Sequence, residues 1–339
     1  MTLKEAIARV SRGDDLERDE AAAVMHLIMA GEATPAQIGG LLVAMNIKGR
    51  AISEIAGFAE TMRSFATRVA TTRRPLVDTA GTGGDHKGTF NMSTTAAFVI
   101  AGAGVAVAKH GNRSATSKCG SADVLEALGV KIELPAERIG HCIDEIGIGF
   151  LFARGLHTAM RFVAPVRSEL GVPTIFNILG PLTNPADACG QIMGVYDAEL
   201  VEPIAIVLGQ LGTRHAFVVA GRDGLDEISL SSPSLVAETT GGVVATYEIE
   251  PELYGVDTAP IETLRGGDAN ENAVLLRRVL EGEEGPRRDV VLLNAAPAIV
   301  AGEAAKDLHE GVARAREAID SGAALAKLDA LIHFTGDSQ

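Results

Sequence analysis

The chain has 339 residues, of which 47% are hydrophobic, and a formal net charge of −14 at pH 7. This length suits two domains or one large one, and the scarcity of aromatic residues favours a core of small aliphatic side chains, typical of helices on a parallel sheet. The negative charge argues against a nucleic-acid partner. No apolar run approaches the roughly 20 residues of a membrane span, so no membrane partner is expected.

Cysteine usage and the N-terminus bear on the cellular compartment. Cys119, Cys142 and Cys189 form an odd, widely spaced set without a C-x-x-C motif, which indicates reduced thiols rather than a disulfide framework or a metal site. Residues 1–20 are acidic and amphipathic, unlike a secretory signal or a transit peptide. The sequence therefore predicts a cytoplasmic protein.

Residues 1–70 are predicted to form a small helical domain. Thr2 and Glu5 have the spacing of a capping box, and Thr34 precedes the proline that opens a further helix. Four helices carry apolar stripes, although a domain of about 70 residues has a marginal core by itself. The third stripe is broad, which predicts a homodimer through this domain, on a face that includes Leu41, Leu42, Met45 and Ile47.

Beyond a linker at residues 71–75, the pattern predicts an α/β domain over residues 75–339. Short apolar runs alternate with helices, which is typical of a mostly parallel central sheet flanked by helices. These runs lie in GVAVAKHG, IGFLFA, GQIMGVYD and HAFVVAGRDG. Residues 155–171 are predicted to form one long helix kinked by a proline, and helices of about 155–187 are expected to pack onto the helical domain.

A glycine-rich turn, AGTGGDHKGTFNMST, occupies residues 80–94. Its spacing is not that of a P-loop, because Thr89 stands at the lysine position, nor that of a dinucleotide fold, because His86 replaces the third glycine. The turn joins a short buried strand to a helix, so its backbone N–H groups and the helix N-terminus suit an anion. The alternative is a plain strand–turn–helix connection.

A second cluster, AKHGNRSATSKCGSAD, follows the run GVAVA and so lies at the carboxyl end of a strand, where open α/β sheets bind ligands. It combines hydroxyl side chains with four groups that can carry positive charge, namely Lys109, His110, Arg113 and Lys118. A solvated basic loop is the alternative and fits Lys118 alone. The set as a whole favours a polyphosphate site shared with the glycine-rich turn.

A third motif, GRDGLDEIS, contains the adjacent carboxylates Asp226 and Glu227. In a loop, both side chains can converge on one cation, and oxygen ligands suit magnesium that also binds substrate phosphates. By itself the motif fits an exposed acidic turn. A polyphosphate opposite it would supply the ligands that magnesium lacks.

A fourth candidate is Arg167, which precedes the segment TIFNILGPLTNPA. The Gly-Pro and Asn-Pro steps of this segment suggest a shaped pocket wall. A guanidinium there would bind a substrate carboxylate in a bidentate manner. The alternative, an arginine that points to water, stays open on composition alone.

Six motifs in order, GTGGD, NMST, KHGNR, GSADVLEALG, VRSELGVPTIFNILGPLTNPA and DGLDEIS, resemble the anthranilate phosphoribosyltransferase family. The resemblance spans nearly the whole chain. It implies a small helical domain joined to a larger α/β domain, and commonly a homodimer. It also implies transfer of phosphoribosyl from 5-phosphoribosyl 1-diphosphate (PRPP) to the amino group of anthranilate, in tryptophan biosynthesis. The cofactor implied is Mg²⁺, as two ions with the diphosphate substrate.

The resemblance also assigns roles to residues. Catalytic roles fall to Lys109, Asp85 and His110, and anthranilate contacts to Gly81, Asn112 and Arg167. The metal ligands would be Ser93, Asp226 and Glu227. PRPP would be bound by Gly81, Gly84, Asp85, Thr89, Asn91, Met92, Ser93, Thr94, Lys109, His110, Gly111, Asn112, Arg113, Ser114, Ala115, Thr116, Ser117 and Ser121.

One departure and two alternatives stay open. Where the family often has HHPAM, this chain has GLHTAM, so Leu156 and Thr158 flank His157 and make the acceptor channel less defined than the diphosphate site. The alternatives are an enzyme similar to pyrimidine nucleoside phosphorylases, whose K-H-S-T-G-G signature is not matched, and a non-catalytic nucleic-acid-binding relative, which the acidic charge disfavours.

Overall fold

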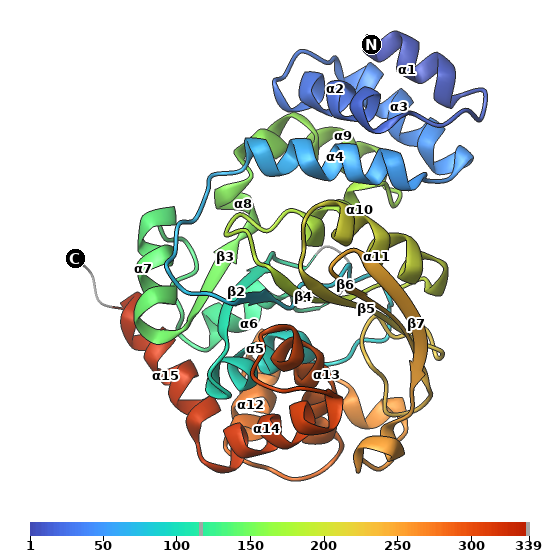
Figure 1. Ribbon diagram of the computed structural model, residues 1–339. Coiled ribbons are helices and arrows are strands. Elements are labelled where there is room, and N and C mark those ends of the chain that lie inside the picture. Colours follow the sequence, from blue (N-terminus) through green and yellow to red (C-terminus); the bar gives the residue numbers. More distant parts are fainter. Residues whose placement is uncertain (115–117, 337–339) are drawn as a thin grey trace. The chain divides into compact units, whose positions relative to one another are not determined.

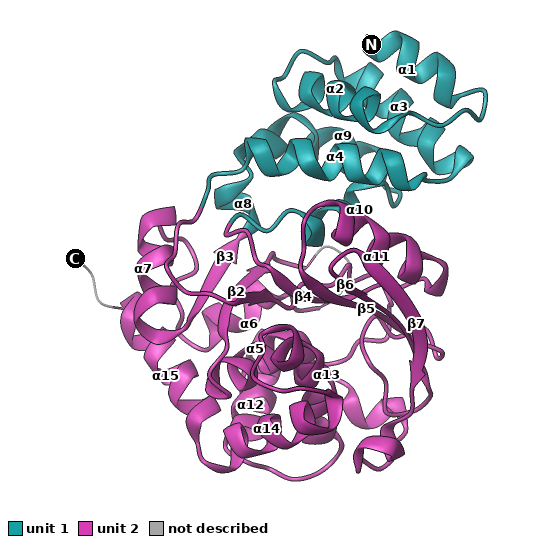
Figure 2. Cartoon of the chain, viewed as in Figure 1, with its two compact units in different colours: residues 1–68, 153–185 teal, residues 69–152, 186–339 magenta. Residues whose placement is uncertain are grey.

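The computed structural model describes residues 1–114 and 118–336. Contacts divide the chain into two compact units (Figure 2). Unit 1 comprises Met1–Arg68 and Ala153–Pro185, and unit 2 comprises Val69–Phe152 and Ala186–Gln339. The chain thus leaves unit 1, builds part of unit 2, and returns to unit 1 once before it completes unit 2.

Unit 1 is entirely helical. Thr2 Oγ1 accepts the N–H of Glu5, and the Glu5 carboxylate accepts the N–H of Thr2, so the predicted capping box is confirmed. Thr34 and Gln37 form a second box, with Pro35 at the first helical position. The helices are α1 (Leu3–Val10), α2 (Arg18–Met29), α3 (Pro35–Lys48), α4 (Ile52–Phe65), α8 (Ala153–Leu156), α9 (Ala164–Leu170) and α10 (Phe176–Leu179), with 3-10 helices η1 (Thr158–Phe162) and η2 (Gly180–Leu182).

The prediction of one long helix over residues 155–171 is wrong. The segment forms three short helices, α8, η1 and α9, which are separated at His157 and Val163. Pro165 has no N–H to donate to the carbonyl four residues earlier, so it is tolerated only in the first turn of a new helix. A helix therefore begins at Ala164 rather than continuing through the proline.

The broad apolar face of α3 is divided between core and surface. Leu41, Leu42 and Met45 are each 1% exposed inside unit 1, so the expectation that they contact a second copy is wrong. Val43 and Ile47 are 39% and 84% exposed. A helix turns about 100° per residue, so positions 43 and 47 share a face that differs from the buried one.

Unit 2 is built on one seven-stranded sheet in the order β3-β2-β1-β4-β5-β6-β7 (Figure 1). The first five strands in this order run parallel, as predicted, and β6 and β7 add an antiparallel hairpin at one edge. The strands are β1 (Leu76–Asp78), β2 (Ala106–Gly111), β3 (Ile148–Phe152), β4 (Gly190–Gly194), β5 (His215–Gly221), β6 (Ser234–Thr240) and β7 (Val243–Ile249).

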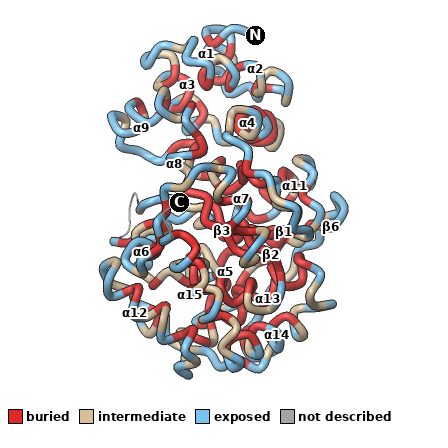
Figure 3. Tube along the Cα trace, turned by 90° about the vertical axis from the view of Figure 1, so that its left-hand side faces the viewer, coloured by how far each residue is buried: buried red, intermediate tan, exposed pale blue. Residues whose placement is uncertain are grey.

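Helices cover both faces of this sheet. In Figure 1, α5 and α13 lie on one face, and α11 lies on the other beside β5, β6 and β7. Thr94 to Ala101 of α5 are all buried, and Figure 3 shows α5 and the central strands mostly red. The α-helices of unit 2 are α5 (Met92–Gly102), α6 (Ser121–Ala127), α7 (Ala136–Ile146), α11 (Val201–Gln210), α12 (Ala269–Leu280), α13 (Pro286–Ala301), α14 (Leu308–Asp320) and α15 (Ala323–Gly336), and its 3-10 helices are η3 (Ala198–Leu200), η4 (Pro251–Tyr254) and η5 (Ile261–Leu264).

The strand order reverses at β1, which pairs with β2 on one side and β4 on the other. In open α/β sheets, ligands bind beyond the carboxyl ends of the strands at such a switch point. The glycine-rich turn follows β1, the basic cluster begins in the last residues of β2 and continues beyond it, and the carboxylate pair follows β5. Of the described residues, none belongs to a helix that is both long and apolar enough to cross a membrane.

Candidate active site

The glycine-rich turn lies directly against the end of β4. The N–H of Thr82 donates to the carbonyl of Gly194 at 2.9 Å. A Cβ on Gly81 would lie 3.1 Å from that carbonyl oxygen and 3.5 Å from Oδ2 of Asp226, so the turn approaches the carboxylate pair closely. Gly83 and Gly84 have φ values of 62° and 87°, which glycine adopts without strain.

The turn leads into the N-terminus of α5. Asn91 is its N-cap residue, and the N–H of Ser93 donates to Oε1 of Glu227 at 3.3 Å. The amide of Asn91 donates to the carbonyl of Cys119 at 3.3 Å and accepts from the amide of Asn272 at 2.9 Å. The helix N-terminus thus holds a carboxylate where the sequence predicted an anion site.

Lys109 and His110 extend from β2 into the same region. Lys109 is 4% exposed, and its Nζ donates to the carbonyl of Thr79 at 3.1 Å. Burial lowers the pKa of Lys109, and the negative charges of Asp78 and Glu227 oppose this shift. The N–H of His110 donates to Oδ1 of Asp78 at 3.0 Å. Lys109 therefore lies close enough to Glu227 for the two side chains to interact electrostatically.

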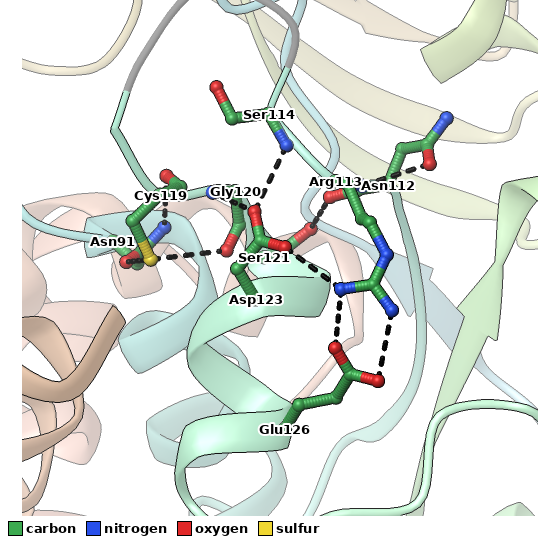
Figure 4. A network of polar contacts seen from close by, with 9 residues as sticks. All are labelled: Asn91, Asn112, Arg113, Ser114, Cys119, Gly120, Ser121, Asp123 and Glu126. Carbon is green, nitrogen blue, oxygen red and sulfur yellow. Dashed lines mark hydrogen bonds and ion pairs between the residues drawn. The ribbon is translucent and has the colours of Figure 1, made fainter. Parts of the chain in front are cut away.

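The loop after β2 has a different charge balance from the one predicted (Figure 4). The guanidinium of Arg113 pairs with the carboxylates of Asp123 and Glu126 on α6. Asp123 also accepts the N–H groups of Ser114 and Gly120, at 3.1 and 2.8 Å. The charge of Arg113 is therefore compensated by α6 and does not join that of Lys109 in a common cationic cluster.

The remaining predicted residues of this loop are distributed as follows. Ser121 Oγ donates to the carbonyl of Asn112 at 3.3 Å, which closes the base of the loop. Lys118 is exposed, in agreement with the solvated alternative. Gly111 approaches Ser121 so closely that a Cβ would lie 2.2 Å from its hydroxyl oxygen. Three predicted residues lie outside the described part of the chain, namely Ala115, Thr116 and Ser117.

Asp226 and Glu227 lie in an irregular loop after β5, as predicted. Burial and the negative charge of Asp85 raise the pKa of Asp226. Burial and Asp226 raise the pKa of Glu227, whereas Lys109 opposes that shift. Oε2 of Glu227 is shielded from solvent, and none of the described residues donates a hydrogen bond to it. The alternative of an exposed acidic turn is therefore wrong.

This arrangement fits a magnesium ion that is held partly by substrate. Shielded carboxylate oxygens without partners are expensive unless a cation binds them, and oxygen is the ligand that magnesium prefers. No group of three or more His, Cys, Asp or Glu side chains among the described residues is arranged to hold a metal. An ion here would need phosphate oxygens and waters to complete its coordination shell.

Arg167 lies in unit 1, on α9. Its Nη2 donates to Oδ1 of Asn177 at 3.3 Å, and its guanidinium lies 5.6 Å from the ring centre of Phe176. Burial lowers its pKa, and no carboxylate among the described residues forms an ion pair with it. A partly buried guanidinium in this state suits a bound carboxylate. Gly81 and Asn112, predicted to contact the same substrate, belong to unit 2.

Three side chains that shape the site were not predicted. Asp78 accepts the N–H groups of Thr79 and His110. Its position as a carboxylate at the end of a buried strand is the feature of the sequence that could have indicated its role. Asp123 accepts two backbone N–H groups of the loop after β2, and it is the last residue of the motif AKHGNRSATSKCGSAD. Asn272 contacts Asn91 across 181 residues, and no local pattern in the sequence indicates such a contact.

Two domain models of one family match the chain. The glycosyl transferase family helical bundle domain matches residues 4–66, and the glycosyl transferase family a/b domain matches residues 73–325. A glycine-rich turn, a buried lysine and a carboxylate pair meet at the carboxyl ends of a parallel sheet. Together with the matches, this site defines a glycosyl transferase made of a helical bundle and an α/β domain.

Individual relatives narrow this class. The anthranilate phosphoribosyltransferase of Symbiobacterium thermophilum is 56% identical over 333 residues, which cover 98% of this chain and 98% of that protein. The crystal structure of the anthranilate phosphoribosyltransferase from Thermus thermophilus has a TM-score of 0.93 at 49% identity and covers 98% of this chain and 99% of its own. The chain belongs to the anthranilate phosphoribosyltransferase family, so the resemblance is confirmed.

A more distant structure shows what such a relative binds. The anthranilate phosphoribosyltransferase from Saccharomyces cerevisiae, in complex with PRPP and Mg, has a TM-score of 0.89 at 26% identity and covers 98% of each chain. A second structure of the yeast enzyme contains 4-fluoroanthranilate. Neither the nucleoside phosphorylase alternative nor the nucleic-acid-binding alternative is supported by these relatives.

Proposed function

We propose that the chain transfers the 5-phosphoribosyl group of PRPP to the amino group of anthranilate, releasing diphosphate, as a step of tryptophan biosynthesis. The observation that carries this function is the convergence of the glycine-rich turn, Lys109 and the Asp226–Glu227 pair at one end of the parallel sheet. The 56% identity to a relative of that name supports it over the full length.

The diphosphate group of PRPP is proposed to bind at the turn and the N-terminus of α5. Backbone N–H groups of a glycine-rich turn and of a helix start suit phosphate oxygens. The residues proposed to contact PRPP are those predicted from the sequence, except that Arg113 needs to leave Asp123 and Glu126 to contribute its charge. Ser93, Asp226 and Glu227 are proposed to hold magnesium together with the substrate phosphates, as two ions.

The reaction breaks the anomeric C–O bond and forms a C–N bond. Negative charge develops on the departing diphosphate, so its stabilisation is the main catalytic task. Magnesium supplies positive charge to these oxygens when it is bound. Lys109 adds a second positive charge from the buried end of β2.

The ribosyl carbon becomes cationic as the bond breaks, and Asp85 is proposed to stabilise it or to orient hydroxyls and metal-bound water. The Asp85 carboxylate interacts with that of Asp226, so it lies beside the proposed metal site, which supports a role of this kind. The aromatic amine of anthranilate is already neutral at pH 7, so it needs no general base to attack. His110 is proposed to accept the proton that the product amine loses.

Arg167 is proposed to bind the anthranilate carboxylate. Its guanidinium is held by Asn177 and Phe176, and no carboxylate among the described residues neutralises it. Asn177 itself is fixed because its Oδ1 also accepts the N–H of Thr174 at 3.0 Å. Such pre-orientation lowers the entropic cost of binding. Gly81 and Asn112 are proposed as further contacts of anthranilate.

A homodimer through unit 1 is proposed, with the contact on the exposed face of α3 instead of on the buried residues Leu41, Leu42 and Met45. The exposed face of α3 carries no charged side chain at positions 36, 40, 43 and 47, and it includes Val43 and Ile47. Val172 is 49% exposed next to Pro173, whose carbonyl accepts from the amide of Asn46 on α3. We propose that this apolar surface contacts a second copy, because exposed apolar patches mark association sites. The reduced state expected of the cysteines supports action in the cytoplasm.

The function is tested by mixing the purified protein with PRPP, MgCl₂ and anthranilate. Anthranilate fluorescence should disappear while one diphosphate is released per anthranilate consumed. Omission of either PRPP or magnesium should stop both signals. Release of diphosphate without loss of anthranilate, or an absence of turnover with all three components, would overturn the proposed function.

A further inference from the structure

A buried asparagine of α13 binds the loop that carries the carboxylate pair. Asn294 is 3% exposed, and its Oδ1 accepts the N–H of Ile228 at 2.9 Å. Its Nδ2 donates to the carbonyl of Ile228 at 2.9 Å and to the carbonyl of Val290 at 2.9 Å. One amide therefore satisfies both backbone groups of the residue that directly follows Glu227, and it is tied to its own helix at the same time.

The loop needs such an external partner. Residues 222–233 form no strand or helix, so their backbone groups have no regular ladder to join. Asp223 fixes the first part of the loop, since it accepts the N–H of Leu225 at 3.2 Å and the hydroxyl of Ser229 at 2.7 Å. Asn294 binds Ile228, which lies between Leu225 and Ser229 in the sequence.

Repulsion between neighbouring carboxylates also disfavours the position of Asp226 and Glu227. Asp226 interacts with the carboxylates of Glu227 and Asp85, which repel one another when they are ionised. The backbone carbonyl of Asp226 lies so close to Gly194 that a Cβ there would be 1.5 Å away. A small displacement of the loop would therefore either collide with β4 or move the carboxylates away from the turn and Ser93.

We propose that Asn294 is a positioning residue for magnesium binding, because its amide clamps Ile228 and so holds Asp226 and Glu227 in the geometry that accepts a magnesium–PRPP complex. This inference rests on the proposed function of the pair as magnesium ligands. Asn294 itself touches neither metal nor substrate. It acts through the backbone of the loop, in the way that outer partners orient metal ligands in many proteins.

The test measures PRPP binding rather than turnover. Isothermal titration of PRPP into the full-length protein is repeated at stepped MgCl₂ concentrations, for the wild type, Asn294→Ala and Asn294→Asp. The Asp side chain can still accept the N–H of Ile228, but it places an oxygen against the Ile228 carbonyl. It is nearly isosteric with Asn, so it allows the test to be made if Asn294→Ala does not fold. Both variants should need about 10-fold more magnesium for half-maximal binding, and saturating magnesium should restore binding.

Arg288→Gln is the matched control on the same helix. Arg288 is 7% exposed and pairs with Asp320 of α14 at 2.5 Å, so its loss disturbs α13 without touching the loop. Its magnesium requirement should stay within about twofold of the wild type even if its Tm falls. Equal magnesium requirements in the wild type and both Asn294 variants, or an equal increase in Arg288→Gln, would overturn the inference. A wild type that binds no PRPP with magnesium would instead overturn the proposed function.

Discussion

The backbone N–H of Ser93 donates to Oε1 of Glu227 across a distance of 3.3 Å and 134 residues of sequence. This contact joins the N-terminus of α5 to the loop after β5. The second carboxylate oxygen of Glu227 is shielded and accepts no hydrogen bond from the part of the chain that the structure describes. Glu227 is therefore oriented by one oxygen while the other is available to a cation.

The first prediction concerns this carboxylate pair. Asp226→Asn combined with Glu227→Gln should reduce kcat by at least about 100-fold at limiting magnesium, since the ligands that bring positive charge to the departing diphosphate are lost. The Tm should stay equal or rise, because the change removes adjacent like charges whose pKa values are raised by burial. Steady-state kinetics and calorimetry measure the two effects.

A matched control for the pair is Glu283→Gln with Glu284→Gln. These residues are also adjacent carboxylates, but both are exposed to solvent. Their replacement should leave kcat and the magnesium requirement unchanged. Near-normal turnover of the Asp226 and Glu227 variant at limiting magnesium would remove this pair from the metal-binding role.

The second prediction concerns the acceptor substrate. Arg167→Ala should raise the KM for anthranilate about tenfold or more, because a charge-assisted contact contributes roughly 1.5–3 kcal/mol. The KM for PRPP should change much less. Arg161→Ala is the control, since Arg161 is exposed and packs over Phe162 at 4.7 Å. If Arg167→Ala changed only the KM for PRPP, Arg167 would belong to the donor site.

The third prediction concerns assembly. Val43→Glu combined with Ile47→Glu should convert the proposed dimer to monomers in sedimentation velocity, without loss of helical structure, because both side chains are exposed in the single chain. Val274→Glu, which replaces a 51% exposed side chain on α12, should leave the dimer intact. A wild type that sediments as a monomer, or a double variant that still dimerises, would contradict the proposal. Charged substitutions at Leu42 and Met45 would instead disrupt the core.

The fourth prediction concerns the pH dependence of stability. Burial lowers the pKa of His157 to about 4, below the usual value near 6.5. Between these pH values the unfolded chain binds a proton that the folded chain does not, so the free energy of unfolding falls as the pH decreases through this window. The free energy of unfolding is higher by about 3 kcal/mol at most when His157 is neutral in both states, which is the case above pH 6.5.

His157→Gln tests this pH dependence. Denaturant unfolding at pH values from 7 down to 4 should show a smaller loss of stability in His157→Gln than in the wild type. His141→Gln, which replaces an exposed histidine, should follow the wild-type curve. Identical slopes in all three proteins would show that His157 does not titrate in this window.

Short sequence patterns predicted the helix caps and strands, because these depend on residues that are close together in sequence. The capping box at Thr2, the helix start at Thr34 and Pro35, and the strands before the motifs follow from short-range periodicity and from residue preferences. The glycine-rich turn lies at the carboxyl end of β1 because it directly follows that strand in the sequence. These features could be inferred because each depends on residues close together in sequence.

Features that depend on distant partners could not be inferred. The pairing of Arg113 with Asp123 and Glu126 depends on how α6 returns beneath the loop, and a list of nearby cations does not reveal it. Asn294 contacts Ile228 across 66 residues. The buried side of α3 was misjudged because a broad apolar stripe does not indicate which of its residues face the core.

The most direct test of the central claim is a crystal structure of the protein with PRPP in which Mn²⁺ replaces Mg²⁺. The anomalous signal of manganese should lie beside the Asp226 and Glu227 carboxylates and Ser93, with the diphosphate against the glycine-rich turn and near Lys109. Manganese and diphosphate located away from these residues, or PRPP bound there without any metal signal, would contradict the account.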